Sequence, residues 1–491
     1  MKKGEGFAGR LAGWFDSRLG LSRPLLNPVP QYAINPFYWL GALAVVAFVI
    51  QGVTGMILML YYVPSPTDAY PSTLYIFQNV YNGTFLQTVH LYTAYAMIML
   101  AFMHMMRGYF VSVQKKPREV MWIVGMLMGF VTLGFGFTGY LLPWTVVSKS
   151  ATDVGVGMIS ALPQPLSSLL TFLIVGGGGD AAQLLRFFDL HVVVLPAALL
   201  ILLVAKMYML EAHGVADPPS GKPEETKRRL LPIFPDVTLY LFEISMLFGV
   251  GMLLISILFP LTLPPQYTPQ AASQYAPQPD WYFLWVYQVL KISIFEGTQG
   301  LAVALSIVTI VFLAFLVLPF VDRGQNRQIS RRPIYTTLGL VFVAEVLLLS
   351  YWGLITPGAT IPAEQAALVI GGTALVISAG SLLVYRVMYS QAKSRLPLAQ
   401  PNLLGGSELR TGVAFTGLLA GGALAIGSTL NSAVAVILGN GSFGTVATLV
   451  GSAVGLALMV LGTVLLLYRL EVRTGTVRRR VGFLDRMWKN E

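Results

Sequence analysis

The chain has 491 residues, of which 55% are hydrophobic and 11% charged, and its mean hydropathy is +0.69. This composition excludes an ordinary soluble protein and predicts a polytopic membrane protein. The sequence contains no cysteine. Disulfides, thiolate metal sites and cysteine-ligated iron–sulfur clusters are therefore excluded within this chain.

Apolar runs long enough to cross a bilayer as helices recur along the chain. They lie at 36–62, 86–110, 119–142, 188–210, 237–262, 301–322, 335–356, 366–389, 411–437 and 444–468. The residues before 36 are mixed and charged, and LAGWFDSRLG is typical of an amphipathic surface helix rather than of a signal peptide. We therefore predict an all-α membrane helical bundle with ten crossings.

Basic residues are distributed unevenly between the two sides of this predicted topology. Of the 32 lysines and arginines, only Lys149, Arg186 and Lys291 fall on the side opposite the termini. The positive-inside rule therefore predicts that both termini are cytoplasmic. This asymmetry accounts for the net charge of +10, so a membrane lipid partner is expected and a nucleic-acid partner is not.

The second span carries two histidines, His90 and His104, fourteen residues apart. On a helix this spacing advances about 21 Å and returns the side chains to nearly the same face. Ionisable groups in a membrane span are costly and are usually functional. The spacing favours two stacked cofactors, one near each membrane surface, over two unrelated polar residues.

Glycines repeat this spacing in two other spans, as Gly41 with Gly55 and Gly125 with Gly139. If a flat macrocycle lay at the depth of each histidine, the neighbouring helices would need glycine at those two depths to leave room for it. Close helix packing alone is the alternative interpretation of each pair.

The fourth span begins near His191, which could face His90 and complete bis-imidazole ligation of one haem. A fourth imidazole at the inner depth is missing, because His213 lies about 33 Å along the helix from His191. Lys206 is at about the right depth, and a kink at Pro196 could align it. Burial favours the neutral amine that ligation requires. Alternatively, Lys206 reaches the inner surface and the second haem is five-coordinate or absent, or Met207 is the donor.

Several motifs resemble, in order, the cytochrome b subunit of cytochrome bc-type quinol-oxidising complexes. They are WLG and TG in the first span, HLYTAYAMIMLAFMHMMRG, FTGYLLPW, RFFDLH and PDWY. The resemblance runs from about residue 10 to 395 and implies an eight-helix cytochrome b core with two extra C-terminal membrane helices. The implied domains are a surface segment (1–35), a di-haem domain (36–235), a C-terminal cytochrome b domain (236–395), and the extra helices with a basic tail (396–491).

The resemblance implies two haems, of b or a type, in the di-haem domain. Their ligands would be His90 and His191 for the outer haem, and His104 for the inner haem, with Lys206 where histidine is usual. Gly41, Gly55, Gly125 and Gly139 match haem-packing glycines.

Two arginines are expected to bind haem propionates. Arg107, one turn after His104, matches the partner of an inner-haem propionate, and its guanidinium forms a fork suited to a carboxylate. The arginine usual before the first histidine is Gln87 here. Arg186 is expected to compensate at the outer haem.

Residues 279–282, Pro-Asp-Trp-Tyr, match the PEWY quinol-oxidation motif, with aspartate in place of glutamate. Quinol oxidation releases protons, so Asp280 is expected to act as the base, with Tyr282 beside it. A turn with interfacial aromatic residues is the alternative. The remaining predicted pocket residues are Tyr140, Pro143, Trp144, Pro279 and Trp281. Thr145 replaces a glycine common in the family and should narrow this pocket.

The function that the resemblance implies is oxidation of a membrane quinol at the outer side of the plasma membrane. One electron would pass to a Rieske-type iron–sulfur protein on another chain and one through the outer haem to the inner haem. A dimer or a supercomplex with terminal oxidase subunits is expected. Two alternatives are a haem-carrying structural subunit of such a supercomplex and a haem-free transporter. An inner quinone site is not predicted, because Glu211 and Leu241 replace the usual histidine and aspartate.

Overall fold

The structure is a computed structural model that describes residues 13–14, 17–18, 28–177, 179–216, 230–276, 278–324 and 326–393. Within these residues, eight helical segments are long and apolar enough to cross a membrane. They are Leu40–Met59, Gly83–Val111, Glu119–Leu141, Gly179–His213, Thr238–Leu258, Gly297–Val321, Pro333–Ile355 and Ala363–Arg386. The first eight predicted spans each overlap one of these segments. The predicted spans 411–437 and 444–468 lie outside the described residues.

The chain divides into two compact units, which cut across the predicted domains. Unit 1 comprises Met1–Ala216, Arg229–Gln325 and Val346–Ala367, and unit 2 comprises Asp217–Arg228, Asn326–Glu345 and Leu368–Glu491. The four-domain division stays a prediction. All the predicted site residues belong to unit 1.

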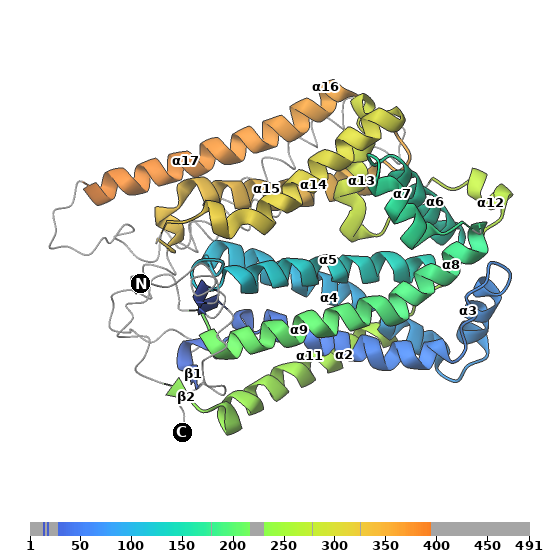
Figure 1. The fold of residues 1–491 in the computed structure, drawn as a ribbon, viewed down its shortest axis with the longest axis horizontal. Helices are drawn as coiled ribbons and strands as arrows, with labels where there is room; N and C mark the ends of the chain where they lie inside the picture. The colour runs from blue at the N-terminus through green and yellow to red at the C-terminus, as the bar shows by residue number, and fades with distance from the viewer. Residues whose placement is uncertain are drawn as a thin grey trace. The chain divides into compact units, whose positions relative to one another are not determined.

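The crossings of unit 1 are arranged around two central helices (Figure 1). These are α4 (Gly83–Val111) and α5 (Glu119–Leu141), which pack against each other. The surrounding helices are α2 (Leu40–Met59), α9 (Leu195–His213), α11 (Thr238–Leu258) and α14 (Gly297–Val321). Of these, α2 and α11 pack against α4, whereas α9 and α14 pack against α5.

The fourth crossing is not a regular α-helix throughout. α8 (Gly179–Asp189) continues into a π-helical turn, η4 (Leu190–Val194), and then into α9. Pro196, at the start of α9, has no N–H to donate to the preceding turn, which explains a change of hydrogen-bond register at this point. His191 lies within the π-helical turn, so the predicted irregularity at Pro196 falls beside a predicted ligand.

Short helices gather at the end of unit 1 where α4 begins and α5 finishes, which we call the PDWY end (Figure 1). They are α3 (Ala69–Gln78), α6 (Val146–Ser160), α7 (Leu166–Leu170), η3 (Thr171–Val175), α12 (Pro269–Ser273), η6 (Trp281–Phe283), α13 (Leu284–Leu290) and η7 (Ser293–Phe295). The sequence analysis did not predict these helices, because each is too short to cross a membrane.

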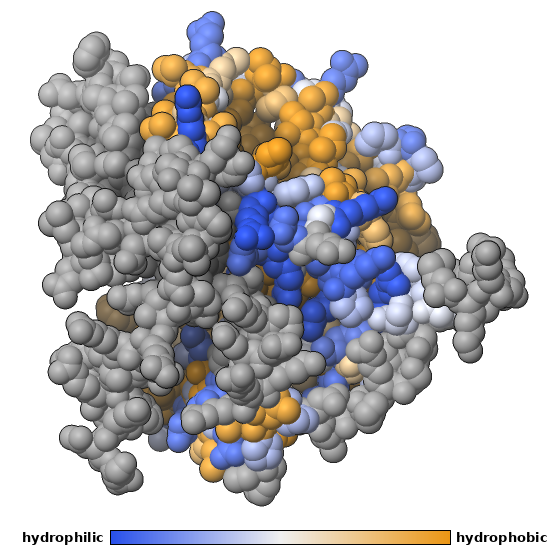
Figure 2. Space-filling model, turned by 90° about the vertical axis from the view of Figure 1, so that its left-hand side faces the viewer, coloured by the Kyte–Doolittle hydropathy of each residue, from blue (hydrophilic) through white to orange (hydrophobic). Residues whose placement is uncertain are grey.

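We call the opposite end of unit 1, where α4 and α9 finish, the Arg107 end. It holds η1 (Gln31–Ala33), η2 (Pro36–Tyr38), η5 (Ile233–Val237) and the antiparallel pair β1 (Val29–Pro30) and β2 (Leu230–Leu231). Figure 2 views this end and shows hydrophilic residues gathered on its face. Lys115 forms an ion pair with Asp322 at 3.0 Å there. A polar surface beyond the apolar crossings is expected where a membrane protein meets water.

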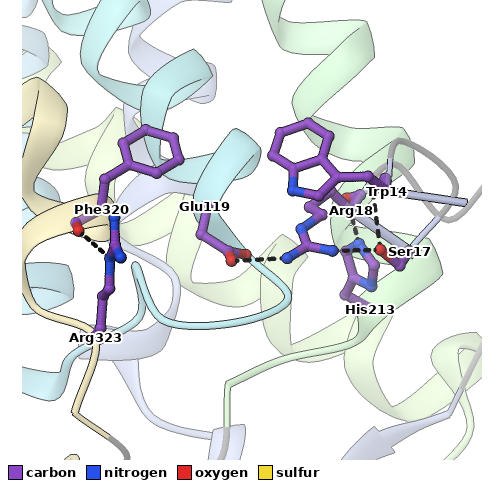
Figure 3. A network of polar contacts seen from close by, with 7 residues as sticks. All are labelled: Trp14, Ser17, Arg18, Glu119, His213, Phe320 and Arg323. Atoms are coloured by element: carbon purple, nitrogen blue, oxygen red, sulfur yellow. Dashed lines mark hydrogen bonds and ion pairs between the residues drawn. The ribbon is translucent and has the colours of Figure 1, made fainter. Parts of the chain in front are cut away.

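A polar network attaches part of the N-terminal segment to the Arg107 end (Figure 3). Arg18 forms an ion pair with Glu119, the first residue of α5, at 3.3 Å. Its backbone carbonyl is hydrogen-bonded to the His213 ring at the end of α9, and its guanidinium lies 4.8 Å from the centroid of the Trp14 ring. His213 is therefore part of a partly buried polar network at the Arg107 end.

Unit 2 contains the first part of α15 (Pro333–Ile355) and all of α17 (Gly372–Lys393). The hydroxyls of Thr337 and Ser381 lie 2.7 Å apart and join these two helices. Tyr385 donates to the carbonyl of Ile329, in η8 (Ile329–Arg331), at 2.6 Å. Before α17 in the chain come α16 (Ala363–Ala366), which belongs to unit 1, and η9 (Ala367–Gly371), most of which belongs to unit 2.

Candidate functional site

His90 of α4 and His191 of η4 face each other across unit 1. Their ring centroids lie 6.4 Å apart, with the ring planes at 70°. In each of the two rings, Nδ1 is hydrogen-bonded to a threonine hydroxyl. His90 Nδ1 lies 2.8 Å from the Thr54 hydroxyl, and His191 Nδ1 lies 3.0 Å from the Thr138 hydroxyl. Because Nδ1 is occupied, Nε2 of each ring is the nitrogen available to a metal.

A second pair lies toward the Arg107 end. His104 of α4 and Lys206 of α9 are close enough to interact electrostatically. The His104 Nδ1 atom is buried and has no hydrogen-bond partner among the described residues. Buried polar atoms are rarely left without partners in native proteins. The structure thus places Lys206 near His104.

Each of the four predicted glycines lies against one of these four side chains. A Cβ on Gly55 would lie 3.3 Å from His90, and one on Gly139 would lie 2.6 Å from His191, both distances being to Cε1. The corresponding distances are 3.0 Å from Gly41 to His104 Cε1 and 2.5 Å from Gly125 to Lys206 Nζ. The glycines that share this spacing therefore share a structural role, because each one contacts a candidate ligand. Lys206 lies against Gly125 in the same way as the three histidines lie against the other glycines.

The two predicted propionate-binding arginines have other contacts in this structure. The guanidinium carbon of Arg107 lies 3.9 Å from the centroid of the Tyr38 ring. Arg186 donates to the backbone carbonyls of Phe172 and Leu173, the latter at 3.0 Å. Their roles toward propionates stay predictions.

Asp280 lies at the PDWY end, with each carboxylate oxygen bonded to a phenol. Tyr95 of α4 donates to Oδ1 at 2.9 Å, and Tyr282 of η6 donates to Oδ2 at 3.2 Å. Burial raises the pKa of Asp280 above its usual value, and the two phenol hydrogen bonds act in the opposite direction. A buried carboxylate with a raised pKa is suited to accept a proton near neutral pH.

Two of the predicted pocket residues, Tyr140 and Trp144, can be related to PDWY by their contacts. Tyr140, at the end of α5, interacts electrostatically with Asp280. The backbone next to Trp144 joins the loop that leads to PDWY, since Val146 donates to the carbonyl of Pro265 at 3.0 Å and Tyr267 donates to that of Trp144 at 3.4 Å. This pairing holds the GYLLPW and PDWY motifs at the same end of unit 1.

Gly136 connects the Asp280 site with the His90–His191 pair. A Cβ on Gly136 would lie 2.9 Å from the Tyr282 hydroxyl, so the Tyr282 side chain packs directly on α5. Gly139, which contacts His191, follows one turn later on the same helix. The two candidate sites are therefore neighbours on α5.

Four residues at these sites were missed by the sequence analysis, namely Thr54, Tyr95, Gly136 and Thr138. Tyr95 lies between His90 and His104 in the sequence, and this position could have marked it as a site residue. The two threonines each precede a predicted haem-packing glycine by one residue, which was a possible signal for both.

Thr145 is buried, and its hydroxyl accepts from the Ser148 N–H at 3.2 Å as the N-cap of α6. This bond holds its side chain in place, so the predicted narrowing of the pocket cannot be relieved by rotation. We expect Thr145→Gly to tighten the binding of inhibitors that press on this backbone by about tenfold. Thr145→Ser, which keeps the capping hydroxyl, is the control and should change the inhibition constant less. Equal inhibition constants in wild type and Thr145→Gly would contradict the prediction.

Two family models match consecutive parts of this chain. Residues 95–274 match the family model described as cytochrome b(N-terminal)/b6/petB, and residues 268–371 match cytochrome b(C-terminal)/b6/petD. The chain is 35% identical over 350 residues to the cytochrome bc complex cytochrome b subunit of Chlorobaculum thiosulfatiphilum, covering 70% of this chain and 80% of that protein. It is 30% identical over 397 residues to a cytochrome b of Sulfolobus acidocaldarius, covering 75% and 69% of the two chains.

A solved structure titled Hyperthermophilic respiratory Complex III matches the fold with a TM-score of 0.57 and 24% identity, covering 77% of this chain and 94% of that chain. The fold and these matches define a multi-pass membrane protein of the electron-transfer class. The chain belongs to the cytochrome b family. The predicted resemblance and fold class are thereby confirmed, and the chain is a cytochrome b subunit of a bc-type redox complex, which is an oxidoreductase. The comparisons give no support to the transporter alternative.

Proposed function

We propose that this cytochrome b carries two haems across the membrane and oxidises a membrane quinol at the PDWY end. The observation that carries the proposal is the contact of each of the four predicted glycines with one of four candidate ligands. Packing glycines without cofactors would have no reason to pair one by one with three histidines and a lysine. His90 and His191 would hold one haem, and His104 and Lys206 would hold the other.

The His90–His191 pair fits a bis-imidazole iron site. The Nδ1 hydrogen bonds leave Nε2 of each ring available, so these two side chains would hold one haem between them. The centroids lie 6.4 Å apart. Thr54 and Thr138 would orient the rings by holding Nδ1, as partners of metal-ligating histidines commonly do.

His104 and Lys206 would hold the second haem. His104 is buried with Nδ1 unpartnered among the described residues, and Gly125 leaves the space that the Lys206 amine occupies. An amine coordinates only when neutral, and burial among apolar helices favours the neutral form. Arg107, three residues after His104, would neutralise a propionate near the membrane edge.

Bound haem supplies one-electron transfer, and the chain's own residues set its position and handle the protons. Asp280 would accept a proton from the quinol hydroxyl, with Tyr282 and the pocket residues Tyr140, Pro143 and Trp144 positioning the ring. Because this chain has no cysteine, the first electron acceptor would be a Rieske-type iron–sulfur protein on another chain. The chain would assemble with terminal oxidase subunits, as a dimer or in a supercomplex.

The proposed topology places both termini in the cytoplasm and the PDWY end on the outer side of the plasma membrane. The Arg107 end, with its polar network and Lys115–Asp322 ion pair, would then be cytoplasmic. This orientation follows from the distribution of basic residues. Protons released at Asp280 would leave on the outer side.

A redox titration with haem extraction, on wild type and Lys206→Ala, tests the haem proposal. We expect two haems in the wild-type protein, and in Lys206→Ala an altered spectrum and midpoint potential for one haem only, because its iron loses a ligand. Met207→Ala tests the alternative donor; Met207 is 46% exposed on α9, so this variant should leave both haems unchanged. A colourless wild-type protein would contradict the whole proposal. Identical spectra of wild type and Lys206→Ala would contradict the lysine ligand alone.

A further inference from the structure

Tyr95 reaches Asp280 from a different element of the fold than the PDWY motif. The two residues are 185 positions apart in the sequence, yet the Tyr95 hydroxyl lies 2.9 Å from Oδ1. The backbone carbonyl of Asp280 also accepts from the Phe283 N–H at 2.9 Å. Asp280 is therefore held at its backbone by η6 and at its side chain by Tyr95 of α4.

The Tyr95 ring is held in place by the two aromatic residues of the PDWY motif. Its centroid lies 6.2 Å from those of both Trp281 and Tyr282, with the ring planes at 81° and 59°. These edge-to-face and tilted arrangements are favourable aromatic geometries. The hydroxyl is thus aimed at Asp280 by its surroundings rather than by a free rotation of the side chain.

We propose that Tyr95 is a positioning residue for Asp280, whose hydrogen bond to Oδ1 orients the carboxylate and keeps it ionised to accept the quinol proton. This inference rests on the proposed quinol oxidation. Each carboxylate oxygen retains a lone pair beyond its phenol hydrogen bond, so proton acceptance remains possible.

Phenols, rather than cations, surround this carboxylate. Tyr95 comes from α4, Tyr140 from α5, Tyr275 from the loop after α12, and Tyr282 from η6. The ion pairs of the described residues do not include Asp280. Burial raises the pKa of Asp280, and the hydrogen bonds from Tyr95 and Tyr282 oppose that rise. Tyr95 is therefore one of two groups that favour the ionised form.

Removing the Tyr95 hydroxyl should move the pH dependence in a defined direction. The loss of a bond to the ionised form raises the pKa of Asp280, so a smaller fraction is ionised at a given pH. Since the proton acceptor must be ionised, the acid limb of quinol oxidation should move to higher pH. A shift of about one pH unit is expected for one hydrogen bond to a carboxylate.

The test is the pH profile of quinol oxidation by the purified complex with wild type, Tyr95→Phe and Tyr92→Phe. Tyr92 is the matched control, because it lies on the same helix but donates to the carbonyl of Phe259 at 2.7 Å. We expect the upward shift in Tyr95→Phe, with the rate restored above the shifted limb, and the wild-type profile in Tyr92→Phe. An unshifted limb in Tyr95→Phe, or an equal loss at every pH, would overturn the inference.

Infrared titration of the protonated carboxyl band that is absent in Asp280→Asn gives a readout independent of turnover. Its midpoint should rise in Tyr95→Phe and stay in place in Tyr92→Phe, and an unchanged midpoint in Tyr95→Phe would also overturn the inference. Failure of this inference differs from failure of the proposed function. If Asp280→Asn oxidises quinol normally, the proposed function fails. If Asp280→Asn is inactive and Tyr95→Phe has the wild-type profile, only the role of Tyr95 fails.

Discussion

The Asp280→Asn variant is expected to oxidise quinol about 10²- to 10⁴-fold more slowly than the wild type, with its haem content intact. Asparagine has nearly the same shape and can still accept the Tyr95 hydrogen bond, but it cannot take up a proton. The measurement is steady-state quinol oxidation together with haem quantification on the same preparation.

Asp280→Glu is the matched control for this variant. It restores the carboxylate at the length usual in the related motif and should retain most of the activity. A wild-type rate in Asp280→Asn would contradict the role of Asp280. It would instead favour the alternative in which the chain is a haem-carrying structural subunit without quinol turnover of its own.

The Gly139→Ala variant is expected to lose one of the two haems. A Cβ at this position would lie 2.6 Å from the His191 ring, so either the ring or α5 must move. The His90–His191 pair would then no longer be aligned, and no compensating space is available in a packed helix bundle. The measurement is haem content per protein together with the reduced-minus-oxidised spectrum.

Gly134→Ala, on the same helix, is the matched control. A Cβ there would make ordinary contacts of 3.5 Å with Leu195, and the variant should keep both haems. Full haem content with an unchanged spectrum in Gly139→Ala would contradict the proposed outer site. Equal losses in the two variants would indicate general damage to α5 rather than a specific effect on His191.

The depths of Lys206 and His213 along the fourth crossing could be predicted from helix geometry. Residue spacing alone excluded His213 as the partner of His104 and left Lys206 as a candidate at about the right depth, with Met207 as an alternative donor, because the rise per residue of a helix is nearly constant. In the structure, Lys206 lies against Gly125, and His213 lies in the polar network with Arg18. What spacing could not predict is the π-helical turn at Leu190–Val194, which depends on the local hydrogen-bond register next to Pro196.

The sequence by itself determined the eight described crossings, the family, and the spacing of His90 and His104 with the glycines that match it. The crossings and the matching spacings depend on apolar run length and helical periodicity, and the family depends on short motifs in order along the chain; all are local properties of the sequence. Only the tertiary structure decided that Tyr95 donates to Asp280, that Gly136 supports Tyr282, and that Thr54 and Thr138 hold the imidazoles. Those contacts join residues far apart in sequence, and they arise from how α4, α5 and the PDWY end pack together, which no local pattern encodes.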